Sequence, residues 1–513
     1  MTNWSHGYNL TTGYTFGFYR ELAPDWIDLG LSLRGLEPPR PAATTPFRYL
    51  ELGSGQGFGL CLLAAANPQG EFVGIDFSPE HNAHARSLAA TMGLHNIRFD
   101  EGDFAALGDA WPADYGEFDY VVMHGIYSWV PKGIRESLIA ILTAAVRSGG
   151  VVYVSYNAMP GWVSTLPFQH ILRLLESSGA TKGIAAIEVG RELFGKLEQA
   201  DSGVTRALPG LKARIEGTRK QPENYLVQEY LHENWHPLWC SQVMAELAGA
   251  KLDLAGSATM AEQLLPQILP QSHRDVLAGQ QHPMLREDLI DCLINQTFRR
   301  DIYVRGQRRR LPADASWQES FRFWRLNPAL VPDEILVATS FGNLKLDGKA
   351  VAPIIEAIGE ASLSLAEIVR LPSVRANPRA LNQQLVLLIQ SGWLACGRRD
   401  HAEGESARSA NAAVARLAAV GAPYRHIAAP ALGSAVPAGD SELILLHAYL
   451  AGTETFAAQG AALLKEGLGR LGRKLAKDGK ALEGAEEMAE LERVTQQFTS
   501  QTVPHWRRLG AIA

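Results

Sequence analysis

The residues with the clearest chemical use lie between positions 51 and 76. Glycines alternate with other residues in one short run: Gly53, Gly55, Gly57 and Gly59. The run follows an apolar segment that ends in Glu51-Leu52, and a second apolar segment about twenty residues on ends in Asp76. Glycine lets the backbone approach a bound molecule closely, and a carboxylate at a strand tip suits a ribose diol. The pattern therefore predicts a nucleoside-containing cofactor at the carboxyl ends of a parallel sheet.

The spacing of the glycines distinguishes between cofactors. A dinucleotide fingerprint needs glycine at the first, third and sixth positions. Phe58 holds the sixth position counted from Gly53, and Leu60 holds it counted from Gly55. The pattern Glu-x-Gly-x-Gly-x-Gly that starts at Glu51 instead resembles motif I of class I S-adenosylmethionine methyltransferases. The resemblance implies S-adenosylmethionine as cofactor; a structural glycine-rich turn of another α/β protein is the alternative.

Further candidate cofactor contacts follow the predicted strands. Asp103-Phe104 comes after the third strand, where an acid can accept from the adenine amino group and an apolar neighbour can flank the ring. Asp76 has a second interpretation as a helix-capping carboxylate, since Ser78-Pro79 follows it. The remaining candidates for cofactor binding are Tyr14, Tyr19, Ser54, Phe77 and His124.

The candidate catalytic residues come mostly after the fourth strand, in the run His-Gly-Ile-Tyr-Ser-Trp-Val-Pro at 124–131. His124 is a candidate general base. A structural histidine is the preferred alternative, because methyl transfer to an amine needs orientation more than a strong base. Tyr127 and Trp129 are expected to form an aromatic wall.

A second cluster of aromatic and ionisable residues occupies 225–239, and we select Glu229 and His232 from it as catalytic candidates. The order His-Glu-x-x-His at 232–236 matches a zinc-binding pattern. We expect no metal there, because Pro237 ends the helix and no third ligand is evident. Six arginines between 299 and 310 predict a charged sheet edge, with an anionic docking stripe as the alternative.

Apolar strands alternate with helices along the first part of the chain, which predicts a doubly wound parallel sheet. Strands are expected near 48–53, 71–76, 96–100, 118–123 and 151–156, with helices at 60–66, from Ser78 to Gly93, and at 132–147. After a helical stretch the alternation resumes with a helix at 240–249, a strand at 251–256, a helix at 284–297 and a strand at 300–305. We expect the last two strands to be antiparallel.

The fold class expected is α/β, a Rossmann-like seven-stranded sheet with a helical insertion, followed by a mostly helical, winged-helix-like half. The domains predicted are an aromatic cap (1–45), a methyltransferase domain (46–310) with an insertion over the site (163–238), a winged-helix-like regulatory domain (311–400), a linker (401–440) and a helical domain (441–513). The recognition helix expected at 377–391 contains one basic residue, Arg379, so contact with DNA is not expected.

Composition narrows the class of protein. The 513 residues are 46% hydrophobic and carry a net charge of -6, which gives no reason to expect nucleic acid or an anionic membrane as partner. Four widely spaced cysteines argue against zinc, iron–sulfur clusters and a disulfide framework. We expect a cytoplasmic protein, since no signal peptide or membrane-spanning run is visible.

Several segments together are similar to bacterial class I methyltransferases that carry a methyltransferase regulatory domain. The matching runs are 51–59, 124–131, 155–162, 228–231 with Pro237, and 298–300. Gln228 replaces a histidine that is common in relatives, so a catalytic role there does not carry over. Some relatives methylate lysines on bacterial surface proteins.

The resemblance implies N-methylation of protein side chains, lysine first. A small-molecule N- or O-methyltransferase and a non-catalytic S-adenosylmethionine-binding regulatory protein are the alternatives. The partner expected is accordingly a protein substrate or a small-molecule acceptor, and the additional domains are compatible with a homodimer.

Overall fold

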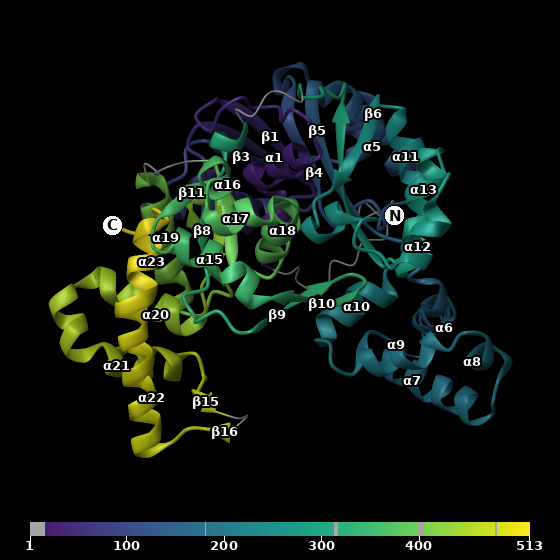
Figure 1. Ribbon diagram of the computed structural model, residues 1–513. Coiled ribbons are helices and arrows are strands. Elements are labelled where there is room, and N and C mark those ends of the chain that lie inside the picture. The colour runs from purple at the N-terminus through teal and green to yellow at the C-terminus, as the bar shows by residue number, and fades with distance from the viewer. Residues whose placement is uncertain (1–15, 180, 312–316, 399–403, 478–479) are drawn as a thin grey trace.

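The structure, a computed structural model, describes residues 16–179, 181–311, 317–398, 404–477 and 480–513 (Figure 1). Tyr14, which the sequence predicts as a cofactor contact, lies outside the described residues, as do residues 1–15 of the predicted aromatic cap.

A seven-stranded sheet in the order β3-β2-β1-β4-β5-β7-β6 forms the centre of the first part of the chain. Its strands are β1 (Phe47–Leu52), β2 (Gly70–Asp76), β3 (Ile97–Glu101), β4 (Phe118–Met123), β5 (Val146–Asn157), β6 (Leu252–Ser257) and β7 (Phe298–Arg305). β7 pairs antiparallel with both β5 and β6. The prediction of two antiparallel strands was therefore wrong for β6. Because β6 is antiparallel to β7 and β7 is antiparallel to β5, β6 runs in the same direction as the first five strands.

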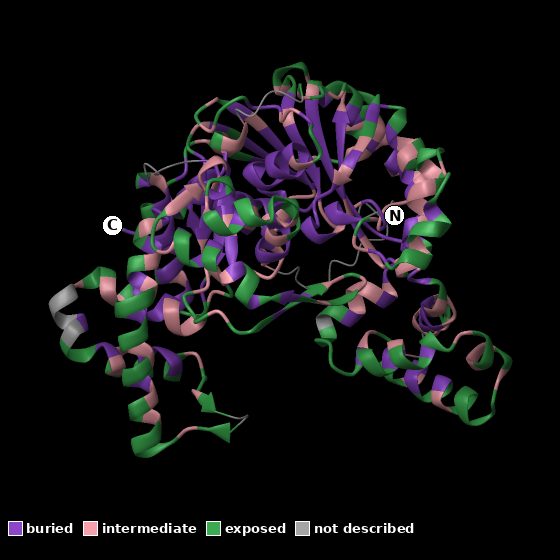
Figure 2. Cartoon of the chain, viewed as in Figure 1, coloured by how far each residue is buried: buried purple, intermediate pink, exposed green. Residues whose placement is uncertain are grey.

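Helices cover both faces of the sheet (Figure 1). One face packs against α1 (Pro24–Leu33), α2 (Phe58–Ala66) and α3 (Pro79–Thr91), and the other against α4 (Phe104–Asp109), α5 (Lys132–Ala145) and α11 (Cys240–Ala248). The inner strands β1, β4 and β5 are largely buried on both faces, as Figure 2 shows, which explains their continuous apolar sequences. Ser78 caps α3 and Pro79 begins it, as predicted.

The predicted helical insertion forms a lobe with a core of its own, at the lower right of Figure 1. Its helices are α6 (Leu166–Ser177), α7 (Ile184–Gln199), α8 (Gly203–Ala207), α9 (Gly210–Thr218) and α10 (Glu223–Leu231). The chain then returns along β5, where Leu238 N donates to Asn157 O at 2.9 Å. Two more helices, α12 (Gln271–Leu277) and α13 (Pro283–Ile294), precede β7.

The next part of the chain contains a small sheet of β8 (Arg322–Arg325), β11 (Ser362–Ser364) and β12 (Leu394–Gly397), and a hairpin of β9 (Glu334–Thr339) and β10 (Gly342–Asp347). Its helices are α15 (Gly348–Ile358), α16 (Leu365–Val369), α17 (Pro372–Ala376) and α18 (Leu381–Gln390). Helices followed by a short strand agree with the predicted order of elements. The assignment of this part as a winged helix stays a prediction.

The sequence predicts a linker at 401–440, but most of the described residues in this range form a packed helix and a hairpin. Residues Glu405–Ala419 form α19, which packs against α2 and α20, and residues 426–437 form the hairpin of β13 (His426–Ala429) and β14 (Ser434–Pro437). The alanines that suggested a linker are strong helix formers, and their small side chains allow close packing. The chain ends with α20 (Asp440–Ala451), α21 (Thr453–Arg470), α22 (Gly484–Gln497) and α23 (Val503–Arg508).

A buried cluster of charges joins the first and last parts of the chain. Arg40 Nη2 donates to Asp25 Oδ1 at 2.5 Å and to Asp28 Oδ2 at 2.8 Å. Arg398 Nη1 donates to the same Asp28 oxygen at 2.8 Å, and the Tyr120 hydroxyl donates to Asp28 Oδ1 at 2.6 Å. All these side chains are almost completely buried. Asp25 and Asp28 belong to α1 and Tyr120 to β4, so the cluster fixes α1 between the sheet and the C-terminal half.

Among the described residues, no helix is both long and apolar enough to cross a membrane.

Replacing one acid of the buried cluster should destabilise the fold strongly. Asp28→Asn leaves two buried guanidinium groups short of a counter-charge, which should lower the free energy of unfolding by about 3–5 kcal/mol. Chemical denaturation followed by circular dichroism measures this. Asp333→Asn, which removes an exposed partner of Lys349, should change stability by at most about 1 kcal/mol. Equal stability of the two variants would contradict the role given to the cluster.

Candidate active site

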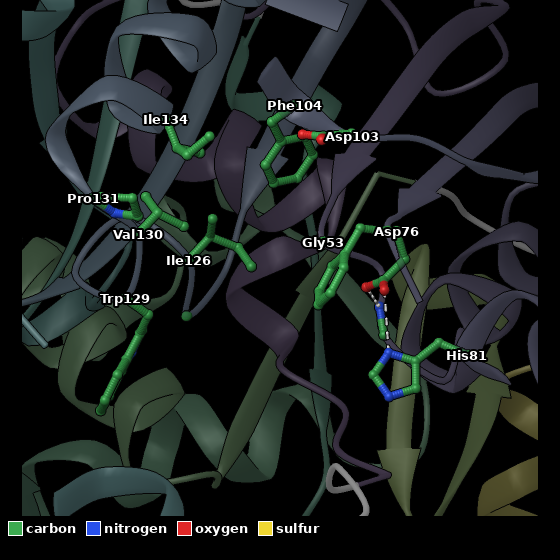
Figure 3. A pocket seen from close by; sticks show the side chains of 13 residues that line it. Gly53, Asp76, His81, Asp103, Phe104, Ile126, Trp129, Val130, Pro131 and Ile134 are labelled. Carbon is green, nitrogen blue, oxygen red and sulfur yellow. Dashed lines mark hydrogen bonds and ion pairs between the residues drawn. The ribbon is translucent and has the colours of Figure 1, made fainter. Parts of the chain in front are cut away.

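Asp76 ends β2, and its carboxylate is fixed by the glycine turn and by the start of α3. Oδ2 accepts from Gly55 N at 2.9 Å (Figure 3), and Oδ1 accepts from Ser78 N at 2.9 Å. His81 Nδ1 lies 3.2 Å from Oδ1. The helix itself is capped by Ser78 Oγ, which accepts from His81 N. Asp76 therefore stands beside the turn at the edge of a cavity, and the helix cap is a different residue.

The glycine turn brings the backbone between two adjoining cavities. Gly53 has a φ of 76°, a left-handed conformation, and a Cβ at this position would clash with the Ile126 side chain. Only glycine meets both conditions without strain. Because Gly53 lines both cavities, a single elongated ligand can extend from one to the other across the turn.

The first cavity is mostly apolar. Phe104 lies on one side, and residues of the segment after β4 lie on the other (Figure 3). The apolar residues of that second side are Ile126, Val130, Pro131 and Ile134. Asp103, the N-cap of α4, and Asp76 add carboxylates to the lining. A flat apolar slot with acids at its edges suits a purine base attached to a ribose.

The second cavity is more polar. Tyr19, Glu51, Ser54 and His124 line it. Burial, together with the nearby Asp76 carboxylate, raises the pKa of Glu51 to about 8. The buried Ser54 Oγ has no hydrogen-bond partner within the described part of the chain. A buried hydroxyl without a partner is costly, and the polar end of a bound ligand would satisfy it.

His124 is enclosed by the residues that surround this cavity. The Tyr19 ring lies 3.9 Å from the His124 ring, centroid to centroid. His124 Nδ1 is 3.0 Å from the Tyr153 hydroxyl and 3.2 Å from Ser155 Oγ. Burial, and secondly the charge of Arg300, lower the pKa of His124 to about 3. An imidazole so weakly basic is a poor general base, and its surroundings favour the orienting role.

Tyr127 was predicted to form an aromatic wall of the site, but it lines neither cavity. Its side chain is fully buried beneath the sheet, away from both cavities, and its hydroxyl donates to Glu246 Oε2 at 2.6 Å. Trp129, two residues on, does line the first cavity, and its ring lies 5.2 Å from that of His232. The residues of one loop thus point in opposite directions, which the spacing alone did not reveal.

The end of the helical insertion brings Glu229 to the carboxyl end of β5. Asn157 Nδ2 donates to Glu229 Oε1 at 3.2 Å. Burial raises the pKa of Glu229 to about 7. Burial also lowers the pKa of His232, to about 4. Two neighbours, Tyr230 and Trp235, instead pack in the core of the insertion.

The zinc-binding pattern seen in the sequence does not lie on a helix. Helix α10 ends at Leu231, so His232 and His236 do not share a helix face. Among the described residues, no group of three or more His, Cys, Asp or Glu side chains is arranged to hold a metal ion.

Comparison with known families identifies the chemistry of this site. Residues 45–191 match a family model described as a methyltransferase domain, and residues 222–305 match one described as a predicted methyltransferase regulatory domain. The chain is an S-adenosylmethionine-dependent methyltransferase. The cofactor and the regulatory domain expected from the sequence are thereby confirmed.

Individual relatives of the methyltransferase include an uncharacterized protein of Synechocystis sp. strain PCC 6803, 29% identical over 99% of each chain. An arsenite methyltransferase of Halobacterium salinarum is 28% identical over 34% of this chain and 42% of its own. The structure of PKMT2 from Rickettsia typhi in complex with AdoHcy aligns with 97% of this chain and 99% of its own, with a TM-score of 0.71 at 17% identity. That likeness confirms the predicted Rossmann-like sheet and the mostly helical C-terminal half, while the winged helix stays a prediction.

The residues present fit the cofactor of the methyltransferase. The apolar cavity would hold the adenosine, with Asp76 at the ribose and Phe104 at the base. The polar cavity would hold the methionine end, where Ser54 Oγ needs a partner. Of the predicted contacts within the described residues, all line one of the two cavities: Tyr19, Glu51, Gly53, Ser54, Gly55, Asp76, Phe77, Asp103, Phe104 and His124.

Sequence reasoning did not select several residues that line the first cavity. His81 contacts Asp76 from the first turn of α3, and its position three residues after the Ser78 cap was an available signal. Ile126 and Val130 lie in the loop that was singled out for Tyr127 and Trp129. Their apolar character after a strand tip could have indicated a wall for the base.

Removing the Asp76 carboxylate should weaken cofactor binding. Asp76→Ala removes a buried hydrogen-bonding group worth about 1.5–3 kcal/mol, so the Kd for S-adenosylmethionine should rise about ten- to a hundredfold. Calorimetric titration measures this. Glu71→Ala, an exposed acid at the other end of the same strand, serves as the matched control and should bind normally. Equal affinities of the two variants would remove Asp76 from the site.

Proposed function

We propose that this methyltransferase N-methylates an amino group of a protein side chain, with lysine as the first candidate. The observation that carries the proposal is Glu229, a carboxyl group that Asn157 holds at the end of β5. Ser155, two residues before Asn157 on the same strand, contacts His124. Because alternate residues of a strand point to the same face, Asn157 and Ser155 hold Glu229 and His124 on the same side of the sheet. Glu229 is not among the residues that line the two cavities.

The chemistry of this arrangement suits an amine. When bound, S-adenosylmethionine supplies a methyl group activated by the sulfonium. Glu229, as a carboxylate, would attract an ammonium group and take the proton that the amine must lose before it attacks. The neutral His124 ring would orient the amine, since a protonated imidazole would repel it. Trp129 lines the first cavity, and the His232 ring packs against it. The proposed roles of Glu229 and His124 do not depend on Tyr127, which lies outside both cavities.

Two further points support a protein acceptor. The sequence resembles bacterial methyltransferases, some of which act on lysines of surface proteins. The chain also carries more than 200 residues beyond the methyltransferase sheet, and the alignment with PKMT2 covers 97% of the whole chain. A small-molecule acceptor is an outcome of the following test.

Labelled methyl groups should enter the protein fraction of a host lysate. Purified protein is incubated with tritiated S-adenosylmethionine and lysate from a deletion strain, and the protein and small-molecule fractions are counted separately. We expect label in protein, in methylated lysine after hydrolysis. Asp76→Ala should transfer far less label, which controls for other enzymes. Label confined to small molecules would replace the proposal with the small-molecule alternative, and no transfer to either fraction would favour the non-catalytic one.

The pH dependence of turnover should report on Glu229. Since its pKa is raised to about 7, the group is protonated below that pH and a carboxylate above it. Turnover should therefore rise between about pH 6 and 8, before the rise expected from deprotonation of the amine itself. Glu229→Gln should lose the rise near pH 7 and keep the later one, with cofactor affinity unchanged. A wild-type profile without a step near pH 7 would contradict the role of Glu229.

A further inference from the structure

A cleft larger than either cofactor cavity lies next to the segment that contains Phe18 and Tyr19. Its volume is about 720 Å³, within the roughly 300–1,000 Å³ common for ligand sites. Phe18 and Tyr19 line both this cleft and the polar cofactor cavity. Tyr19 is also the residue whose ring lies against His124. A ligand in the cleft would thus lie one layer of side chains away from the methyl-transfer site.

Arg300 is one of two arginines that line this cleft, together with Arg20. It lies on β7 opposite Ser155, and its Nη1 is 3.5 Å from Thr259 Oγ1. Its Nε is buried without a hydrogen-bond partner, and within the described ranges no carboxylate forms an ion pair with it. Its charge nevertheless reaches His124, whose pKa it helps to lower. A guanidinium with unused donors beside a cleft is a site for an anion.

The neighbouring residue on β7 shows how unusual this is. Arg299 points to the opposite face of the sheet and forms ion pairs with three acids: Glu287, Asp291 and Asp301. The fold thus neutralises Arg299 completely. Arg300 contacts the Phe298 ring, with its guanidinium carbon 4.9 Å from the centroid, and a hydroxyl.

The other charges of the cleft leave it electropositive. Arg20 donates to the carbonyl oxygens of Ile389 and Gln390 at the end of α18, each at 3.2 Å, and no carboxylate of the described residues forms an ion pair with it. Burial lowers the pKa of His426 to about 4, so this side chain is neutral near pH 7. Glu21 is the single acid of the lining. Two guanidinium groups therefore face one carboxylate, which favours an anionic ligand.

The walls of the cleft suit an extended chain. β12 and β14 both contribute to the lining, and each is an edge strand of its sheet. An edge strand offers backbone donors and acceptors that can pair with an added strand. The cleft is thus lined by residues of two edge strands, by two arginines and by Tyr19.

We propose that this cleft docks the methyl acceptor as an extended polypeptide segment, and that Arg300 binds a carboxylate close to the methylated amine. The proposal rests on the proposed function, because it takes the acceptor to be a protein. It goes further in assigning an acidic sequence around the modified residue and a specificity-determining role to Arg300. Arg300 is not part of the lining of either cofactor cavity, so its replacement should leave cofactor binding intact.

Two matched peptides test the proposal by binding alone. One carries a lysine flanked by glutamates, the other the same lysine flanked by glutamines, both with blocked ends and a fluorescent label. Fluorescence polarisation measures their affinity for the full-length protein saturated with AdoHcy. The glutamate peptide should bind about tenfold more tightly, because a charge-assisted hydrogen bond to Arg300 adds to its affinity. Arg300→Gln should abolish the difference, whereas Arg309→Gln, at an exposed position outside the cleft, should preserve it.

Each other outcome overturns the proposal. Equal binding of the two peptides, no binding of either, or a preference that survives in Arg300→Gln would exclude an acidic acceptor site at Arg300. Weaker AdoHcy binding by a folded Arg300→Gln variant would assign the residue to the cofactor instead. Because no methyl is transferred in this assay, it is independent of the labelling experiment, and a failure of amine methylation is recognised separately.

Discussion

The buried pairing of Arg40 and Arg398 with Asp25 and Asp28 is the constraint on which the rest of the structure depends. Charges removed from water must be paired closely, because a single missing partner leaves an uncompensated ion in a medium of low polarity. The two acids lie on α1, which begins at Pro24, shortly after Tyr19. Arg398 comes more than 350 residues later in the chain. The cluster therefore fixes α1 to the C-terminal half of the chain, and with α1 the preceding segment around Tyr19, which covers the polar cofactor cavity.

Groups of opposite charge lie on the two sides of Tyr19. On the cofactor side lie the carboxyl groups of Glu51 and Asp76, the first with its pKa raised to about 8 by burial and by the second. On the far side of Tyr19 lies the guanidinium of Arg300, and between them His124 is kept neutral by burial and that same charge. A cover held by the C-terminal half thus separates an acidic cavity from a basic cleft.

Local sequence was sufficient for the methyltransferase sheet and for much of the cofactor site. Strands, helix starts and turns depend on residues that are neighbours in the sequence, as the cap at Ser78 and the glycine turn at Gly53 show. Strand tips that share one edge then bring Asp76, Asp103 and His124 to the same place. Only the direction of β6 was misassigned within the sheet, because strand direction follows from pairing partners that lie far apart in the sequence.

The amino-acid sequence by itself thus determined the fold class, the cofactor and the residues at the strand tips. The tertiary structure alone decided which side chains of one loop enter the cavity: Tyr127 turns to Glu246, while Ile126 and Trp129 face the site. It also turned the alanine-rich segment of α19 from a linker into packed core and left Arg300 without an acid beside fully paired Arg299. The physical reason is that burial and charge pairing depend on residues hundreds of positions apart, which no local pattern encodes.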